Sequence, residues 1–116
     1  MGSFVAAFLL VGLAGIPAVA QEKAPAEPTV KVLAENDKVR VQEATYKPGA
    51  ESPMGERPFR VIRVLKGGTL LLTFPDGKSD TWRLKEGQTK LADPGTYGLK
   101  NIGKTTVRLY IVRVLK

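Results

Sequence analysis

The stretch Lys47-Pro-Gly-Ala-Glu-Ser-Pro-Met-Gly-Glu-Arg-Pro58 lies between two groups of segments with strand patterns. It holds three prolines and two glycines, a composition too broken for a helix or a central strand. We therefore expect a loop over Pro48–Pro58, with strands before and after it. The stretch contains no histidine or cysteine, and both residue types are absent from the whole chain.

Strand patterns fill the sequence on both sides of this loop. Apolar and polar residues alternate with a period of two, and Asn36-Asp37 and Asp76-Gly77 provide turn chemistry. The expected strands lie within 30–32, 39–42, 59–65, 69–74, 80–84, 90–92, 97–101 and 105–115. No segment after Ala20 has a helical period. The sequence predicts an all-β fold, an antiparallel sandwich or barrel of about eight short strands.

The last expected strand contains an irregularity. Val107, Leu109 and Ile111 share one face, but the next residue on that face is Arg113. The apolar side chains pass instead to Val112 and Val114. This change of phase predicts a bulge or a change of sheet.

The first twenty residues have the pattern of a secretory signal peptide. They carry no charged side chain, are apolar from Phe4 to Ala14, and end in Ala18-Val19-Ala20. We expect cleavage after Ala20 and a secreted or periplasmic protein. The n-region has no Lys or Arg, so an uncleaved anchor and a buried helix remain open as alternatives. The mature chain contains no membrane span.

Composition predicts the linker and domain boundaries and limits the kinds of binding partner expected. Residues 21–28 lack large apolar side chains, which predicts a flexible linker before a domain at 29–116. The net charge is +7, but the basic residues form no run, so there is no strong nucleic-acid signal. If several of the strand arginines fell on one sheet face, they could bind an anionic polymer; these are Arg40, Arg60, Arg63, Arg83, Arg108 and Arg113.

The order of glycines and strands resembles a small single-domain cupin. Gly49, Gly68, Gly87, Gly95 and Asn101 stand at the spacing of the two cupin motifs. The resemblance covers nearly all of the mature chain. It implies a jelly-roll barrel of two sheets, a bacterial source, and a dimer formed through strand edges.

The same alignment implies that the metal ligands of the two motifs have been lost. Gly55 and Arg57 stand in the positions of the first two histidines, and Val61 stands in that of the glutamate. Tyr97 falls on the third histidine if one residue is deleted. Because imidazole and carboxylate are the ligands a transition metal needs in such a site, we expect no metal and no cofactor.

The candidate ligand-binding residues are Arg57 and Tyr97. An inward-facing Arg57 could hold a carboxylate or phosphate, and Tyr97 could donate a hydrogen bond to it. An exposed loop arginine and a space-filling aromatic are the alternative interpretations. We expect a non-enzymatic module that binds a small polar or anionic ligand. A metal-independent isomerase or epimerase, or a structural dimerisation domain with no ligand, is the alternative.

Overall fold

The computed structural model describes residues 26–116, which form nine β-strands and no helix. The strands are β1 (Thr29–Glu35), β2 (Val39–Tyr46), β3 (Glu51–Arg57), β4 (Arg60–Lys66), β5 (Gly68–Thr73), β6 (Ser79–Leu84), β7 (Thr89–Ala92), β8 (Gly95–Asn101) and β9 (Val107–Val114). None of the described residues forms a helix long and apolar enough to cross a membrane. The predicted signal peptide and residues 21–25 of the predicted linker lie outside the described residues.

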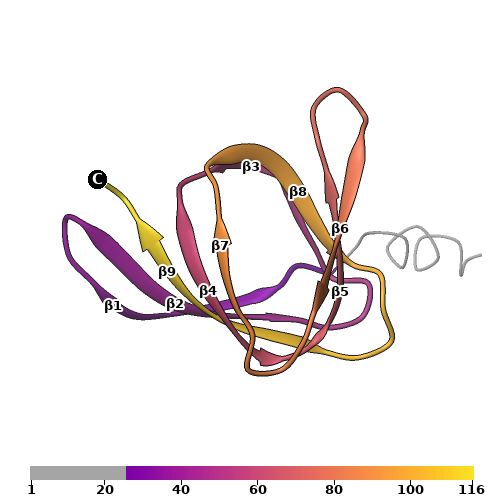
Figure 1. Cartoon of the computed structure of the whole chain (residues 1–116), viewed down its shortest axis with the longest axis horizontal. Helices are drawn as coiled ribbons and strands as arrows, with labels where there is room; N and C mark the ends of the chain where they lie inside the picture. Colours follow the sequence, from indigo (N-terminus) through magenta and orange to yellow (C-terminus); the bar gives the residue numbers. More distant parts are fainter. Residues whose placement is uncertain (1–25) are drawn as a thin grey trace, which may run out of the picture.

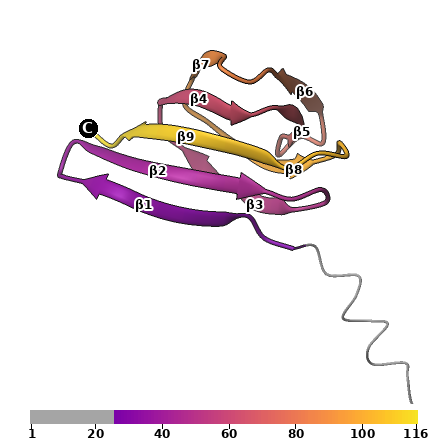
Figure 2. The same cartoon turned by 90° about the horizontal axis from the view of Figure 1, so that it is seen from below.

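The strands form two antiparallel sheets. One has the order β1-β2-β9-β4-β7, and the other has the order β3-β8-β5-β6. The sheets face one another and curve into a barrel, from which the β1–β2 hairpin and the end of β9 extend to one side (Figure 1). The view from below shows β1, β2 and β9 running side by side (Figure 2). The prediction of an all-β jelly roll is confirmed.

The expected loop at Pro48–Pro58 is wrong in one respect, because residues 51–57 form strand β3. β3 pairs with β8 and lies at the edge of its sheet, with a register shift between Ser52 and Gly55. Proline removes one backbone donor, which an edge strand tolerates. The backbone hydrogen bonds of β3 are made with β8, which lies far along the chain. The local sequence of residues 51–57 therefore does not predict this strand. The exclusion of a central strand is confirmed.

The expected bulge in the last strand is also wrong. β9 pairs with β2 in unbroken register from Val107 to Val114. The irregularity lies on β4 instead, between Val64 and Lys66. Arg113 therefore stays on the face that carries Ile111. A cationic side chain continues the inner face of the sheet where the apolar ones stop.

The core lies between the two sheets. Its fully buried side chains come from both layers and are mainly aliphatic; the largest are Ile62, Leu70, Leu99, Leu109, Val64 and Val107. Burying each stabilises the fold by about 1.5–3 kcal/mol. Aliphatic side chains between the two sheets thus hold the sheets together. The buried polar residues, Arg60 and Asn101, lie toward the ends of the barrel.

One end of the barrel is closed by the amide of Asn101, which is 1% exposed. Its Nδ2 donates to the carbonyl oxygens of Tyr46 at 2.9 Å and Thr105 at 2.8 Å, and its Oδ1 accepts from the N–H of Gly103 at 2.9 Å. Its backbone exchanges hydrogen bonds with Gly49 and Ala50. Two connections, β2–β3 and β8–β9, are therefore joined at a single buried residue.

Candidate functional site

Arg57 ends strand β3 at the opposite end of β8 from Asn101, because its register partner is Gly95. Its Nε donates to the carbonyl oxygen of Tyr97 at 3.0 Å, and its Nη2 donates to Ser52 Oγ at 2.8 Å. Burial lowers the pKa of the Arg57 guanidinium, and the charges of Arg60 and Arg113 lower it further. Tyr46 and Tyr97 act in the opposite direction. Arg57 is thus a fixed, partly desolvated cation.

Tyr97 lies on β8 inside the barrel and is 4% exposed. The Arg57 Cζ atom lies 5.0 Å from the centre of the Tyr97 ring, within the range of a cation–π contact. Phe74 and Trp82 meet the same ring edge-on, at centroid distances of 5.9 and 6.1 Å. The fold therefore brings together the two candidate residues, Arg57 and Tyr97, from strands far apart in sequence.

Arg60 is a further candidate site residue that the motif spacing does not include. It begins β4, is 4% exposed, and donates a hydrogen bond from Nη2 to the Tyr97 hydroxyl. Its Cζ lies 5.7 Å from the Tyr97 ring centre and 5.8 Å from that of Trp82. Its buried Nε has no hydrogen-bond partner among the residues described. Burying a cation costs free energy unless the cation is paired, so Arg60 is a candidate for contact with an anion.

A sequence signal for Arg60 did exist in the alternation of β4. Ile62 and Val64 are apolar and buried, and Arg60 precedes them in the same phase. An inward-facing arginine follows directly from that period of two. The spacing of the cupin motif, in contrast, pointed to Val61 as the site position on this strand.

The other two motif positions lie apart from this contact. Val61 is half-buried and belongs to the face of β4 opposite to Arg60 and Ile62. Gly55 is the register partner of Tyr97, and a Cβ atom added there would meet nothing within 4 Å. The structure thus brings together Arg57, Arg60 and Tyr97, whereas Gly55 offers only open space.

The donors at these positions do not fit a transition metal. Gly55 and Val61 have no donor atom, Arg57 is a cation, and Tyr97 offers a phenol that already accepts from Arg60. Within residues 26–116, no three acidic side chains gather as a group that could hold a metal ion. A guanidinium inside the barrel also repels a cation. The chemistry that these residues favour is contact with an anion.

A pocket of about 310 Å3 opens at the rim beside Arg57. It is lined by Glu56, Arg57, Pro94, Gly95 and Thr96. Arg57 therefore reaches both the pocket and the buried ring of Tyr97. Glu56 puts a negative charge on one wall, so an anion is favoured at the Arg57 side of the pocket.

Comparison with known proteins places the fold. No family model and no curated protein matches the sequence. Among solved structures, a cupin domain from Bordetella pertussis matches with a TM-score of 0.71 and 24% identity, over 78% of this chain and 96% of that one. An RmlC-like cupin with a double-stranded β-helix fold from Methanocaldococcus jannaschii matches with a TM-score of 0.59 and 17% identity, over 79% and 84%.

A polyketide cyclase from Streptomyces resistomycificus also matches, with a TM-score of 0.59 and 21% identity, over 81% of this chain and 70% of that chain. At these identities the likeness concerns the backbone and carries no activity from one protein to another. The strand order, the two sheets and these structural matches agree. The chain has the cupin fold.

Proposed function

We propose that this protein is an exported, metal-free cupin-like domain that binds a small anionic ligand and is not an enzyme. The observation that carries the proposal is the convergence of the Arg57 and Arg60 guanidinium groups on the ring of Tyr97. Within residues 26–116, the ion pairs join Arg40 to Glu35 and Arg108 to Glu43. Neither Arg57 nor Arg60 is balanced by a carboxylate in that part of the chain.

Electrostatics supports an anionic ligand. Two guanidinium groups near one ring repel each other, and a bound carboxylate or phosphate relieves that repulsion while accepting their hydrogen bonds. Arginine is suited to this role because its donors form a planar fork that matches either anion. The rim pocket, at about 310 Å3, has the size of a small-molecule site.

The donor set supports binding rather than catalysis. The chain has no histidine and no cysteine, so the common general base and the thiol nucleophile are missing. Tyr97 is the phenol at the centre of the site, and it already accepts a hydrogen bond from Arg60. A group that accepts from a guanidinium and packs among aromatic rings is suited to orient a ligand.

A thermal-shift screen tests the binding site. The panel holds inorganic phosphate, sulfate, acetate and larger carboxylates, each at constant ionic strength. A ligand at ten times its Kd stabilises the protein by about 1.4 kcal/mol, which raises Tm by roughly 6–11 °C for a domain of this size. We expect the shift in wild type and in Arg83→Ala, which removes an exposed arginine of β6. We expect none in Arg57→Ala.

Two results contradict this proposal. One is a panel in which no anion shifts wild type. The other is a shift of equal size in wild type and Arg57→Ala. Export is tested separately, by cell fractionation and N-terminal sequencing of the mature protein. We expect Gln21 as the first residue, and an intact Met1 in the cytoplasmic fraction contradicts export.

A further inference from the structure

Three arginines form a row across the inner face of the larger sheet. Arg113 on β9 is the direct register partner of Arg60 on β4 and of Arg40 on β2. Directly opposed residues of antiparallel strands project from the same face, roughly 5 Å apart. Since Arg60 faces the barrel interior, Arg113 and Arg40 continue its line across β9 and β2, which lie next to β4 in the larger sheet.

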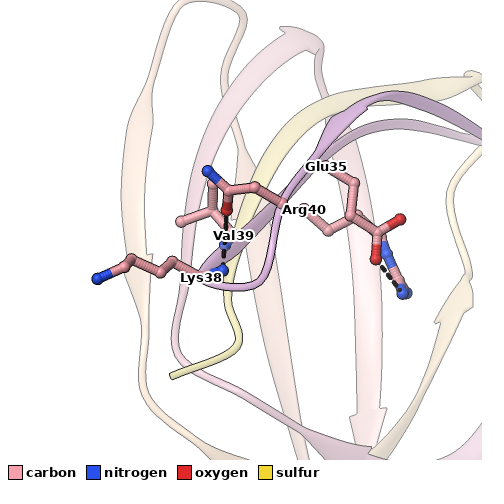
Figure 3. Close-up of polar contacts among 5 residues, drawn as sticks. Glu35, Lys38, Val39 and Arg40 are labelled. Atoms are coloured by element: carbon pink, nitrogen blue, oxygen red, sulfur yellow. Dashed lines mark hydrogen bonds and ion pairs between the residues drawn. The ribbon is translucent and has the colours of Figure 1, made fainter.

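The row is strongly cationic and has one internal counter-charge. Glu35 of β1 lies opposite Arg40, and its carboxylate pairs with the Arg40 Nη2 at 2.8 Å (Figure 3). Burial lowers the pKa of the Arg113 guanidinium, and the charges of Arg40 and Arg60 lower it further, while Glu35 opposes them. Three cations therefore face one carboxylate, which sits at the far end of the row.

Unpartnered donors mark the two ends of the row. The Nε atoms of Arg40 and Arg60 are buried and have no hydrogen-bond partner among residues 26–116. Arg60 itself is 4% exposed. A buried donor without an acceptor is costly, and here two such donors lie in one row of like charges.

We propose that the row Arg60–Arg113–Arg40 binds a multivalent anion that lies across β4, β9 and β2. Its negative groups are spaced by about 5 Å, the distance between neighbouring strands. This inference rests on the proposed function, because Arg60 belongs both to the anion site beside Tyr97 and to the row. It adds that the ligand carries two or more charges and continues from Arg60 toward Glu35.

The proposed contacts follow the direction of the row. One anionic group lies against Arg57 and Arg60, and the next lies between Arg113 and Arg40. Glu35 is then an internal competitor, since its carboxylate already engages Arg40. Removing that carboxylate should strengthen binding, and removing an arginine of the row should weaken it. Opposite effects at two positions separate a specific row from a general response to charge.

Isothermal titration at fixed ionic strength tests the row. The probes are inorganic phosphate, tripolyphosphate, acetate and citrate, which also distinguish a phosphate from a carboxylate source. We expect one multivalent probe to bind wild type at least about tenfold tighter than its simple counterpart. Arg113→Gln and Arg40→Gln should lower that ratio severalfold, and Glu35→Gln should raise it.

Arg63→Gln is the matched control. Arg63 lies on the same strand as Arg60 but is exposed and points to the other face, where it donates to Thr89 Oγ1. Its loss changes the net charge as much as Arg40→Gln does. We expect the ratio in Arg63→Gln to equal that of wild type. Far-ultraviolet circular dichroism checks the fold of each variant, and Arg113→Lys replaces Arg113→Gln if the latter does not fold.

Three outcomes overturn the inference. In the first, multivalent and simple anions bind equally tightly while Arg57 remains necessary; the row then has no role and the simpler anion site stands. In the second, Arg63→Gln lowers the ratio as much as Arg40→Gln, which indicates general charge. If no probe binds, both the row and the proposed function are wrong.

Discussion

Arg60 is a charged side chain at a place in the core where an apolar one packs without penalty. Its guanidinium meets Tyr97 and Trp82, and one of its buried donors is left without a partner among the described residues. Breaking a buried polar pair is expensive, whereas replacing both members with apolar groups of similar size is often neutral or stabilising. The proposed ligand contact of this pair therefore comes at some cost to folding.

Tyr97→Phe tests this account of the pair. It removes the acceptor of Arg60 and should lower the free energy of unfolding by about 1–3 kcal/mol. The double variant Arg60→Met/Tyr97→Phe removes both polar groups and should be at least as stable as wild type. Urea unfolding measures both, and anion titration should show that the double variant no longer binds. A double variant less stable than Tyr97→Phe contradicts the account.

At the residue scale, the spacing of the cupin motifs predicted part of the candidate site. This spacing led to Arg57 and Tyr97, and the structure brings these two residues together at 3.0 Å. It failed at β4, where it led to Val61 although Arg60 faces inward. Motif spacing gives a position only to within about one residue, whereas successive side chains of a strand point to opposite faces. An error of one residue therefore places the side chain on the wrong face. The alternation of β4 carries that information.

At the element scale, strands with regular alternation were predictable and β3 was not. The alternating segments predicted the positions of the other eight strands from local sequence alone. β3 contains a proline and a glycine and becomes a strand only by pairing with β8, which is some forty residues away in the chain. Arg113 likewise interrupts the apolar pattern of β9 but not its register, in which it lies opposite Arg60 and Arg40.

Gly98 controls the approach of β3 to β8. It is buried on β8, opposite the register shift of β3, and a Cβ atom there would lie 3.3 Å from the carbonyl oxygen of Ser52. Gly98→Val should push β3 away and destabilise the fold by roughly 1–3 kcal/mol. It should also displace Arg57, which ends β3.

The measurement for Gly98→Val combines unfolding with anion titration, and we expect both stability and affinity to fall. Gly55→Ala is the matched control, because a Cβ atom at Gly55 meets nothing within 4 Å. We expect that control to stay close to wild type in both respects. Wild-type affinity in Gly98→Val contradicts the idea that β3 positions the ligand contact.

At the scale of the whole molecule, the larger sheet has two unequal edges. β7 is a short edge of four residues, whereas β1 is an edge of seven residues, all exposed. Val30, Val32 and Leu33 of β1 are each about half exposed. A long edge strand with exposed apolar side chains favours pairing with another strand, and a second copy of the chain can supply the same strand about a two-fold axis.

Light scattering coupled to size exclusion measures this association. We expect the mass of a dimer for wild type and of a monomer for Val32→Lys, because a lysine on an edge strand opposes pairing. Leu91→Lys places the same charge on β7, where Leu91 is 65% exposed. We expect that control to remain a dimer. A monomeric wild type contradicts pairing through β1.

The buried amide of Asn101 makes the two ends of the barrel differ in their hydrogen bonding. It joins the β2–β3 and β8–β9 connections at one end of β8, while the other end, at Gly95, has the rim pocket and Arg57. We therefore expect amide protons beside Asn101 to exchange with solvent more slowly than those near Gly95. The proposed ligand site therefore lies at the end of β8 away from the hydrogen bonds of Asn101.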